Sequence, residues 1–189
     1  MAERIIGVVG GAVPIPNKGI FGPIGPLYNL VFASNRVVGV IVRPTSIKDA
    51  LAYQYRGGVL TRHFVIADGI IKQLKGDKTK IKAVKKGELL SNCNLNLDIL
   101  LEENKRLNFS IPYETITDIE VRKGSFLWRP AVLVIKTDQA ERKFLLSWGP
   151  SGASPYSTLF AVWLIDREIK IINKAVPDKI KITDSFFIK

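Results

Sequence analysis

The stretch Leu27–Val42, LYNLVFASNRVVGVIV, contains two runs of aromatic, aliphatic and β-branched residues separated by Ser34, Asn35 and Arg36. Such residues are enriched in strands, and Asn is well suited to the backbone conformations of a tight turn. The stretch therefore predicts a β-hairpin. Its strands are expected to be the second and third strands of a larger sheet.

Strand-forming segments lie on both sides of this hairpin. Residues 4–9, RIIGVV, predict a first strand that stops at Gly10 and Gly11, because adjacent glycines favour a flexible break. After Leu107, four β-rich runs are joined by turn signals, which favours an antiparallel meander. These runs cover residues 107–113, 115–123, 131–137 and 142–148.

A helix is expected to close the meander. Ser154 and Pro155 supply a cap and a first-turn residue. Apolar residues then recur at helical spacing, at Val162, Ile165, Ile169 and Ile172. The pattern predicts a helix that continues to Asn173.

Residues 44–106, between the hairpin and the meander, carry helical patterns. Ser46 and Asp49 have the spacing of a capping box before a short helix over residues 47–55. A second helix is indicated by an apolar stripe at intervals of four and three, formed by Leu60, Phe64, Ala67, Ile71 and Leu74. Asn96 precedes a third helix, over residues 97–105. The segment is expected to be a helical insertion within one domain.

The composition is typical of one packed domain. The chain has 189 residues, of which 47% are hydrophobic, and no apolar run approaches the roughly 20 residues that a membrane-spanning helix needs. A single cysteine, Cys93, excludes an intramolecular disulfide and a cysteine-built zinc site. This cysteine usage is typical of a reducing cytosol, so we expect a cytoplasmic protein, with peripheral attachment to a membrane as an option.

The order of three strands, a helical insertion, four strands and a C-terminal helix resembles the pleckstrin-homology-like superfold, in particular its bacterial and GRAM-type variants. YNLVFASNRVVGVIV is similar to the recurring hairpin of that family, and FSIPYETITDIEVRKG is similar to its central segment. Trp163 lies where such domains often carry a core tryptophan.

The resemblance implies an α+β fold, a seven-stranded antiparallel sandwich or barrel capped by the C-terminal helix. It covers residues 1–173 as one domain, with the insertion between strands three and four, and leaves residues 174–189 as a tail or an extra strand. It also implies a non-enzymatic module that binds lipid headgroups, peptides or proteins. The chain departs from the phosphoinositide-binding members, which place several Lys and Arg in the first loop, because Pro14–Pro26 contains Lys18 alone.

A run of lysines within the insertion is the strongest functional signal. The net charge is +11, and residues 45–94 contribute +6 of it, with 10 basic against 4 acidic residues. Seven lysines accompany the single acid Asp77: Lys72, Lys75, Lys78, Lys80, Lys82, Lys85 and Lys86. Near an anionic membrane each contributes about 1 kcal/mol. Because lysine is a non-directional point charge, it suits a membrane surface better than base readout, which favours arginine.

Other interpretations of the lysines stay open. Charge runs are usually solvated faces, and the same lysines suit a protein partner. Nucleic-acid binding is a further alternative, although residues 72–86 contain no aromatic platform for a base. A structural module that oligomerises through the helix over residues 60–74 and through the C-terminal tail is another.

The segment GSFLWRP, residues 124–130, is a second candidate interface. Phe126, Trp128 and Arg129 lie in an expected turn, where aromatics beside cations can enter a lipid interface or a partner groove. Folding back onto the core is the alternative.

The sequence gives little support for catalysis. The only histidine, His63, borders an apolar stripe, and no serine lies in a nucleophile-elbow motif. We therefore expect no enzyme, no cofactor and no metal site.

Overall fold

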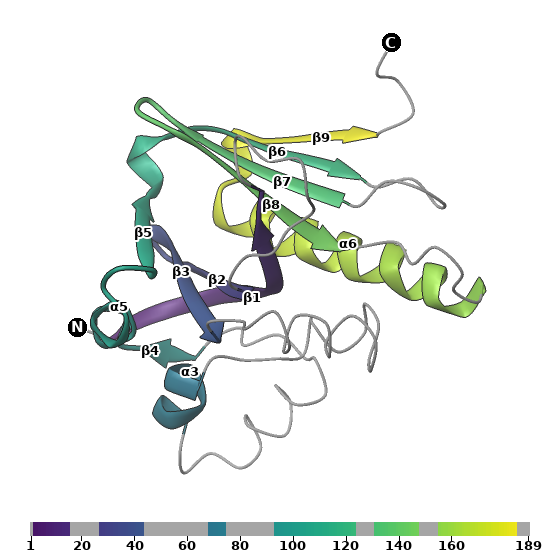
Figure 1. The fold of residues 1–189 in the computed structure, drawn as a ribbon. Coiled ribbons are helices and arrows are strands. Elements are labelled where there is room, and N and C mark those ends of the chain that lie inside the picture. The colour runs from purple at the N-terminus through teal and green to yellow at the C-terminus, as the bar shows by residue number, and fades with distance from the viewer. Residues whose placement is uncertain are drawn as a thin grey trace.

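The computed structural model describes residues 2–15, 27–43, 68–74, 93–123, 131–147 and 155–184. These residues form a mostly-sheet α+β protein, shown in Figure 1. The strands are β1 (Glu3–Pro14), β2 (Leu27–Ala33), β3 (Arg36–Arg43), β4 (Asn94–Leu95), β5 (Phe109–Pro112), β6 (Ile116–Lys123), β7 (Ala131–Thr137), β8 (Glu141–Ser147) and β9 (Ile180–Asp184). The helices are α3 (Asp68–Gln73), α5 (Leu97–Glu103), α6 (Pro155–Ala175) and the short 3-10 turns η1 (Tyr113–Thr115) and η2 (Pro177–Lys179).

The strands form one open sheet in the order β5-β3-β2-β1-β8-β7-β6-β9, with β4 paired to β1 off this path. We call β5-β3-β2-β1 the first half-sheet and β8-β7-β6-β9 the second. The expected hairpin is confirmed, since β2 and β3 pair antiparallel. The four-strand meander is confirmed only in part: β6/β7 and β7/β8 pair antiparallel, but the first expected strand, β5, pairs with β3 and not with β6.

Three expectations about the sheet were wrong. The described residues contain nine strands in place of seven, and β5 and β9 are separate edges, so that the sheet is not a closed barrel. The sheet is also mixed, because β9 runs parallel to β6. A parallel neighbour needs a long crossover that returns the chain to the same end of the sheet, and α6 is part of that connection. Part of the C-terminal tail therefore adds a strand to its own sheet.

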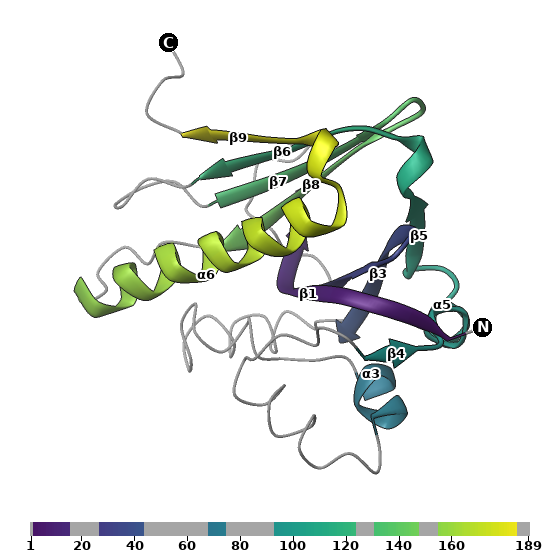
Figure 2. The same cartoon turned by 180° about the vertical axis from the view of Figure 1, so that it is seen from behind.

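Strand β1 joins the two half-sheets. The sequence predicted that it stops at Gly10 and Gly11, but β1 continues through both glycines to Pro14. Gly11 has a φ of 70°, a conformation that glycine adopts without strain, and the register with β2 shifts between Val9 and Ala12. The glycines are thus a bulge and not an end. Beyond it, Val13 and Pro14 pair with β8, and β1 bends from one half-sheet to the other in Figures 1 and 2.

Alternation along the first half-sheet divides its side chains between two apolar clusters. Leu30, Phe32 and Val37 join residues of the second half-sheet and α6 in the larger cluster. Val31 and Val38, which point to the opposite face, pack in a smaller cluster with residues of the insertion. Both faces of the first half-sheet are therefore covered, and every residue of β2 is buried.

Helix α6 covers the inner face of the sheet. The predicted positions Ile165, Ile169 and Ile172 are all buried in the larger cluster, together with Ile171. The helix lies close to β1, because a Cβ atom built on Gly7 would stand only 2.7 Å from Cγ2 of Ile171. A larger residue at this position would require the Ile171 side chain or the helix to shift.

Candidate functional site

Helices α3 and α5, strand β4 and the turn over residues 104–107 form a compact unit that we call the insertion corner. Asn96 caps α5, as its side-chain oxygen accepts a hydrogen bond from the Ile99 amide at 3.4 Å. The Gln73 side chain exchanges two hydrogen bonds with the backbone of Asn96, at 2.7 and 2.9 Å, which ties α3 to α5. The predicted third helix is confirmed as α5. Of the longer predicted second helix, the described part is α3, and residues 44–67 lie outside the described residues.

Ion pairs attach the insertion corner to the sheet. Arg36, at the start of β3, forms a bidentate pair with Glu3 of β1 and a second pair, at 2.7 Å, with Asp98 of α5. The hydrogen bond with Glu3 raises the pKa of Arg36, and the hydrogen bond with Arg36 lowers the pKa of the Asp98 carboxyl. One guanidinium thus links two strands and a helix.

A buried amide makes a second attachment. Asn108 accepts a hydrogen bond from the Ile41 amide of β3 at 2.8 Å and donates one to the Leu100 carbonyl of α5 at 2.6 Å. The Tyr28 hydroxyl of β2 donates to the neighbouring Leu107 carbonyl at 2.9 Å. The Ile41–Asn108 bond gives β3 a partner beyond Gly39, where its pairing with β5 ends. These contacts also fix the turn that follows α5.

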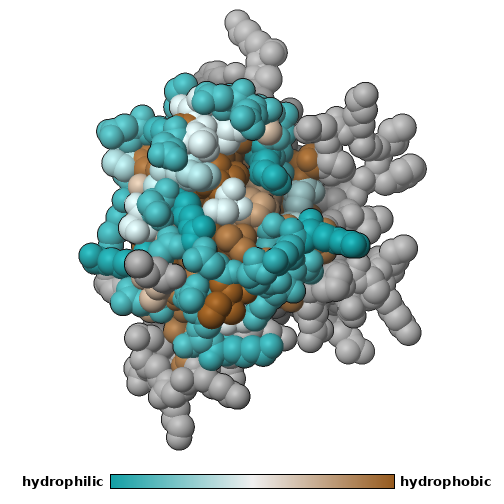
Figure 3. All heavy atoms as spheres, turned by 90° about the vertical axis from the view of Figure 1, so that its left-hand side faces the viewer, coloured by the Kyte–Doolittle hydropathy of each residue, from teal (hydrophilic) through white to brown (hydrophobic). Residues whose placement is uncertain are grey.

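The outer surface of the insertion corner combines exposed apolar and basic side chains. Ile99 is 52% exposed and Leu107 is 39% exposed, and both are among the few large hydrophobic side chains exposed in the described part of the chain. Lys72, Lys105 and Arg106 are also exposed. Figure 3 shows the face on which α5 and β5 lie, where hydrophobic atoms form a brown area bordered by hydrophilic ones.

Acidic residues also lie on this surface, and Glu103 of α5 is exposed. Asp98 pairs with Arg36, and Glu102 pairs with Lys105 along the same stretch of chain. The sequence analysis did not single out Ile99, Lys105, Arg106 or Leu107. The available signal was the string KRL directly after the expected helix, where two cations and a leucine precede the next strand.

Most of the residues predicted to bind an anionic surface lie outside the described residues. Lys72 is described and lies exposed on α3, whereas Lys75, Lys78, Lys80, Lys82, Lys85 and Lys86 lie in the undescribed range 75–92. Phe126, Trp128, Arg129 and His63 are likewise outside. The described positions carry 16 Lys and Arg against 14 Asp and Glu, a net +2, so most of the +11 belongs to the other segments.

The two ends of the lysine-rich range 75–92 are nevertheless fixed at the insertion corner. Leu74 is buried and its amide donates to the Ile70 carbonyl at 3.2 Å. Cys93 is buried as well, and its carbonyl accepts a hydrogen bond from the Ile5 amide of β1 at 2.8 Å. The residues that flank the lysine-rich range, Leu74 and Cys93, therefore both belong to the smaller apolar cluster beneath the insertion corner.

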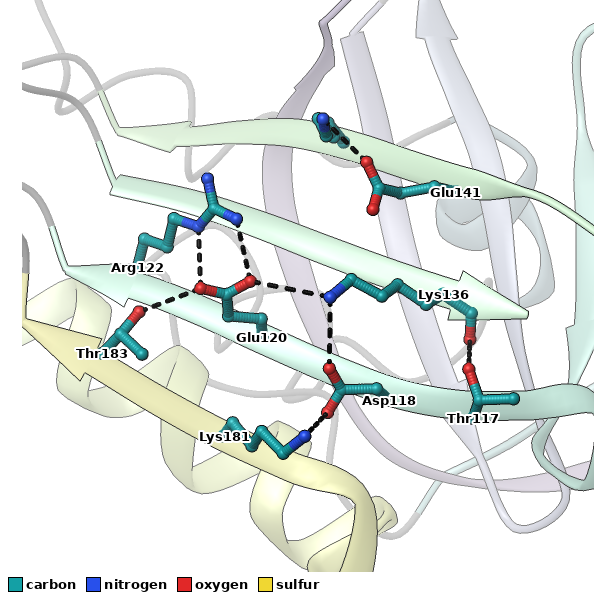
Figure 4. A network of polar contacts seen from close by, with 9 residues as sticks. Thr117, Asp118, Glu120, Arg122, Lys136, Glu141, Lys181 and Thr183 are labelled. Atoms are coloured by element: carbon teal, nitrogen blue, oxygen red, sulfur yellow. Dashed lines mark hydrogen bonds and ion pairs between the residues drawn. The ribbon is translucent and has the colours of Figure 1, made fainter. Parts of the chain in front are cut away.

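The outer face of the second half-sheet carries a different polar surface, shown in Figure 4. Glu120 of β6 accepts two hydrogen bonds from Arg122, at 2.8 and 2.9 Å, and a third from Thr183 of β9 at 3.2 Å. Asp118 pairs with Lys136 of β7 at 3.4 Å and with Lys181 of β9 at 3.3 Å. We call this set the charge network.

Opposite charges alternate across the strands of the charge network. The hydrogen bonds from Arg122 lower the pKa of the Glu120 carboxyl, and Glu120 in turn raises the pKa of Arg122. On β8, which neighbours β7, Glu141 pairs with Lys143 at 2.7 Å, and this contact lowers the pKa of Glu141. Each of these carboxylates has a cation beside it, and the ion pairs and hydrogen bonds of Asp118 and Glu120 join β9, β6 and β7.

No group of three or more potential metal ligands is present among the residues that the structure describes. In the same part of the chain, no helix has the length and apolar character needed to cross a membrane. Comparisons with protein-family models, with curated proteins and with solved structures found no match to this chain.

Proposed function

We propose that this chain is a non-enzymatic binding module of pleckstrin-homology-like architecture, and that its insertion binds an anionic membrane surface. The observation that carries the proposal is the composition of the insertion corner. Exposed Ile99 and Leu107 stand beside exposed Lys105 and Arg106, and the lysine-rich segment begins and ends at this corner.

The strand order supports the architectural part of the proposal. Along the chain, β1 to β3, the insertion, β5 to β8 and the long helix α6 follow one another in the element order on which the pleckstrin-homology resemblance rests, and α6 packs in the larger apolar cluster. In this scheme, β4 and β9 are additions at the insertion and at the C-terminal edge.

The chemistry of an anionic bilayer matches the exposed side chains. Cations gain about 1 kcal/mol each near the headgroups, and apolar side chains gain free energy by leaving water at the acyl boundary. Arg106 supplies the first contribution, together with Lys105, whose ammonium also pairs with Glu102, and Leu107 supplies the second. The rigid attachment through Arg36 and Asn108 means that little order has to be gained when this corner binds.

Co-sedimentation with liposomes tests the proposal. The protein is mixed with neutral or with phosphatidylserine-containing vesicles at low and at physiological salt, and one arm contains an RNA competitor. We expect binding that requires the anionic lipid, persists at physiological salt and is not reduced by RNA. Binding that RNA abolishes would favour nucleic acid, and no binding in any arm would reject the membrane.

Matched variants locate the surface. Replacing Lys105 and Arg106 by Gln is expected to lower the partition coefficient about tenfold or more, because two cations leave the interface. The control replaces Lys170 and Lys174, two exposed cations of α6, by Gln and removes the same charge elsewhere. Leu107→Gln is expected to weaken binding by an amount that does not depend on salt. Equal losses in the two double variants would mean that net charge alone matters.

The lysine run is tested in the same assay. Replacing Lys78, Lys80, Lys82 and Lys85 by Gln is expected to reduce binding without lowering the melting temperature. Unchanged binding would remove this segment from the proposed surface.

A further inference from the structure

Strand β9 is the last strand of the sheet in the part of the chain that the structure describes. It pairs with β6 through five residue pairs, from Ile119 with Ile180 to Lys123 with Asp184. An edge strand presents a row of backbone N–H and C=O groups that a further strand can bind. The outer side of β9 is therefore a potential site of β-strand addition.

The side chains of β9 divide between two faces. Lys181 and Thr183 point to the charge network, where they contact Asp118 and Glu120 in Figure 4. Ile180 packs against the larger apolar cluster on the opposite face. Ile182, two residues further, shares the face of Ile180 but is 48% exposed. The middle of the edge strand thus carries an apolar side chain that this chain covers only in part.

The start of β9 is firmly anchored. The Lys179 ammonium donates hydrogen bonds to the Tyr113 carbonyl at 2.7 Å and to the Ile116 carbonyl at 2.5 Å. These bonds attach η2 to the turn before β6. The strand is consequently held as a fixed template at the edge of the sheet.

We propose that β9 pairs antiparallel with the β9 of a second copy of this chain, across a two-fold axis that passes through Ile182. In an antiparallel pair, directly opposed side chains lie on the same face of the sheet. A two-fold axis perpendicular to the sheet keeps this rule only if the residue at the axis lies opposite the same residue of the second copy. The centre can then be Lys181, Ile182 or Thr183.

Charge and hydrophobicity select among these three centres. An axis at Lys181 places two lysines directly opposite each other, which is unfavourable. An axis at Thr183 places Ile182 opposite Asp184 of the other copy. An axis at Ile182 sets Ile180 opposite Asp184 and Lys181 opposite Thr183, and it alone pairs the two exposed Ile182 side chains without directly opposing like charges.

The second copy is the occupant that this self-complementarity favours. A ladder of five residues is short, and stable interfaces bury at least about 1,000 Å², so the pairing is expected to be a weak and reversible dimer. The two charge networks then lie on the same side of one continuous sheet. This inference goes beyond the proposed membrane binding and involves a different surface.

Sedimentation velocity of the full chain over a range of protein concentrations is the first test. We expect a concentration-dependent shift from monomer to dimer, which Ile182→Lys abolishes. Ile99→Lys is the matched control, because Ile99 is equally exposed but lies on the insertion corner. Thermal melts verify that both variants fold. A monomer at every concentration would overturn the proposal and leave the edge to a strand of another protein.

Cysteine cross-linking tests the register. In a Cys93→Ala background, Ile182→Cys would place two thiols on residues whose Cα atoms are about 5 Å apart, within the range of a disulfide. Thr183→Cys is the control, since its two copies are offset along the strands and their Cα atoms would be about 8 Å apart, beyond that range. We expect Ile182→Cys to form the disulfide dimer at least tenfold faster under a mild oxidant. Equal rates, or a faster Thr183→Cys, would overturn the proposed register.

Discussion

The two half-sheets differ in what covers their outer faces. The first half-sheet is covered on both faces, by the larger apolar cluster on one side and by the insertion on the other. The second half-sheet has one apolar face, and its other face carries the charge network. The insertion is therefore an integral part of the fold, because its residues pack on the second face of β2 and β3.

The sequences of the strands reflect this difference. β2, LYNLVFA, is nearly continuously apolar, and so is β3, RVVGVIVR, between its terminal arginines, as expected for strands buried on both faces. β6, ITDIEVRK, alternates between apolar and charged residues, as expected for a strand with one solvated face. The continuous apolar character of residues 27–42 therefore indicated both a hairpin and a second buried face of its strands.

The largest expected effect comes from the two apolar clusters. Leu100→Ala in the insertion and Leu133→Ala in β7 each remove a fully buried side chain, and each should destabilise the protein by about 2–5 kcal/mol. Urea unfolding measures both free energies. A cost below about 1 kcal/mol for Leu100→Ala alone would show that the insertion is a loosely attached appendage.

An intermediate effect is expected at the buried amide that joins the insertion to β3. Asn108→Ala leaves the Ile41 amide and the Leu100 carbonyl without their partner, at a cost of about 1–3 kcal/mol. Hydrogen exchange should show faster exchange of the Ile41 amide. Thr183→Val is the control, because it removes an exposed hydrogen bond and should change stability by less than about 0.5 kcal/mol. Unchanged exchange at Ile41 would contradict the assigned role of Asn108.

The smallest expected effect concerns the charge network and depends on pH. Because the folded state lowers the pKa of Glu120, its stabilising contribution is present above the usual glutamate pKa of about 4.3 and is lost as the pH falls through the lower folded value. The stability difference between the wild type and Glu120→Gln should therefore shrink in acid.

The size of this difference is limited by solvent. The Arg122 side chain is 41% exposed, so we expect less than about 1 kcal/mol at neutral pH, and less again at high salt. Unfolding of both proteins at neutral and acid pH measures it. A difference that grows in acid would mean that the folded state raises the pKa of Glu120.

Local patterns predicted much of the fold, and long-range contacts account for what they missed. The hairpin, the β6-β7-β8 part of the meander, α5 and α6 were predicted because propensity, turn residues and helical spacing agree within each segment. The first expected strand of the meander, β5, pairs with β3 instead. The end of β1 was wrong, because adjacent glycines have the same local signature in a break and in a bulge. The parallel strand β9 was left open, since a short alternating segment does not specify which edge it will join.

The candidate site was predictable only as a region. The density of lysines pointed to the insertion. In the sequence, however, Ile99 looks like a core residue of a helix and Leu107 like a core residue of a strand, whereas both side chains are exposed. Their exposure depends on how α5 turns toward β3, which the Arg36 and Asn108 contacts decide. Those contacts join residues far apart in the sequence, and no local pattern contains them.

Because β1 bends between the two half-sheets, its two parts acquire their partner strands at different times during synthesis. The ribosome makes β1 before β2, its first partner, which follows shortly after it in the sequence. Val13 and Pro14, beyond the bulge, pair with β8, whose residues emerge far later. Such distant pairing is slow and leaves strand edges unsatisfied on the nascent chain. We expect the end of β1 to be a binding site for chaperones until β8 leaves the ribosome.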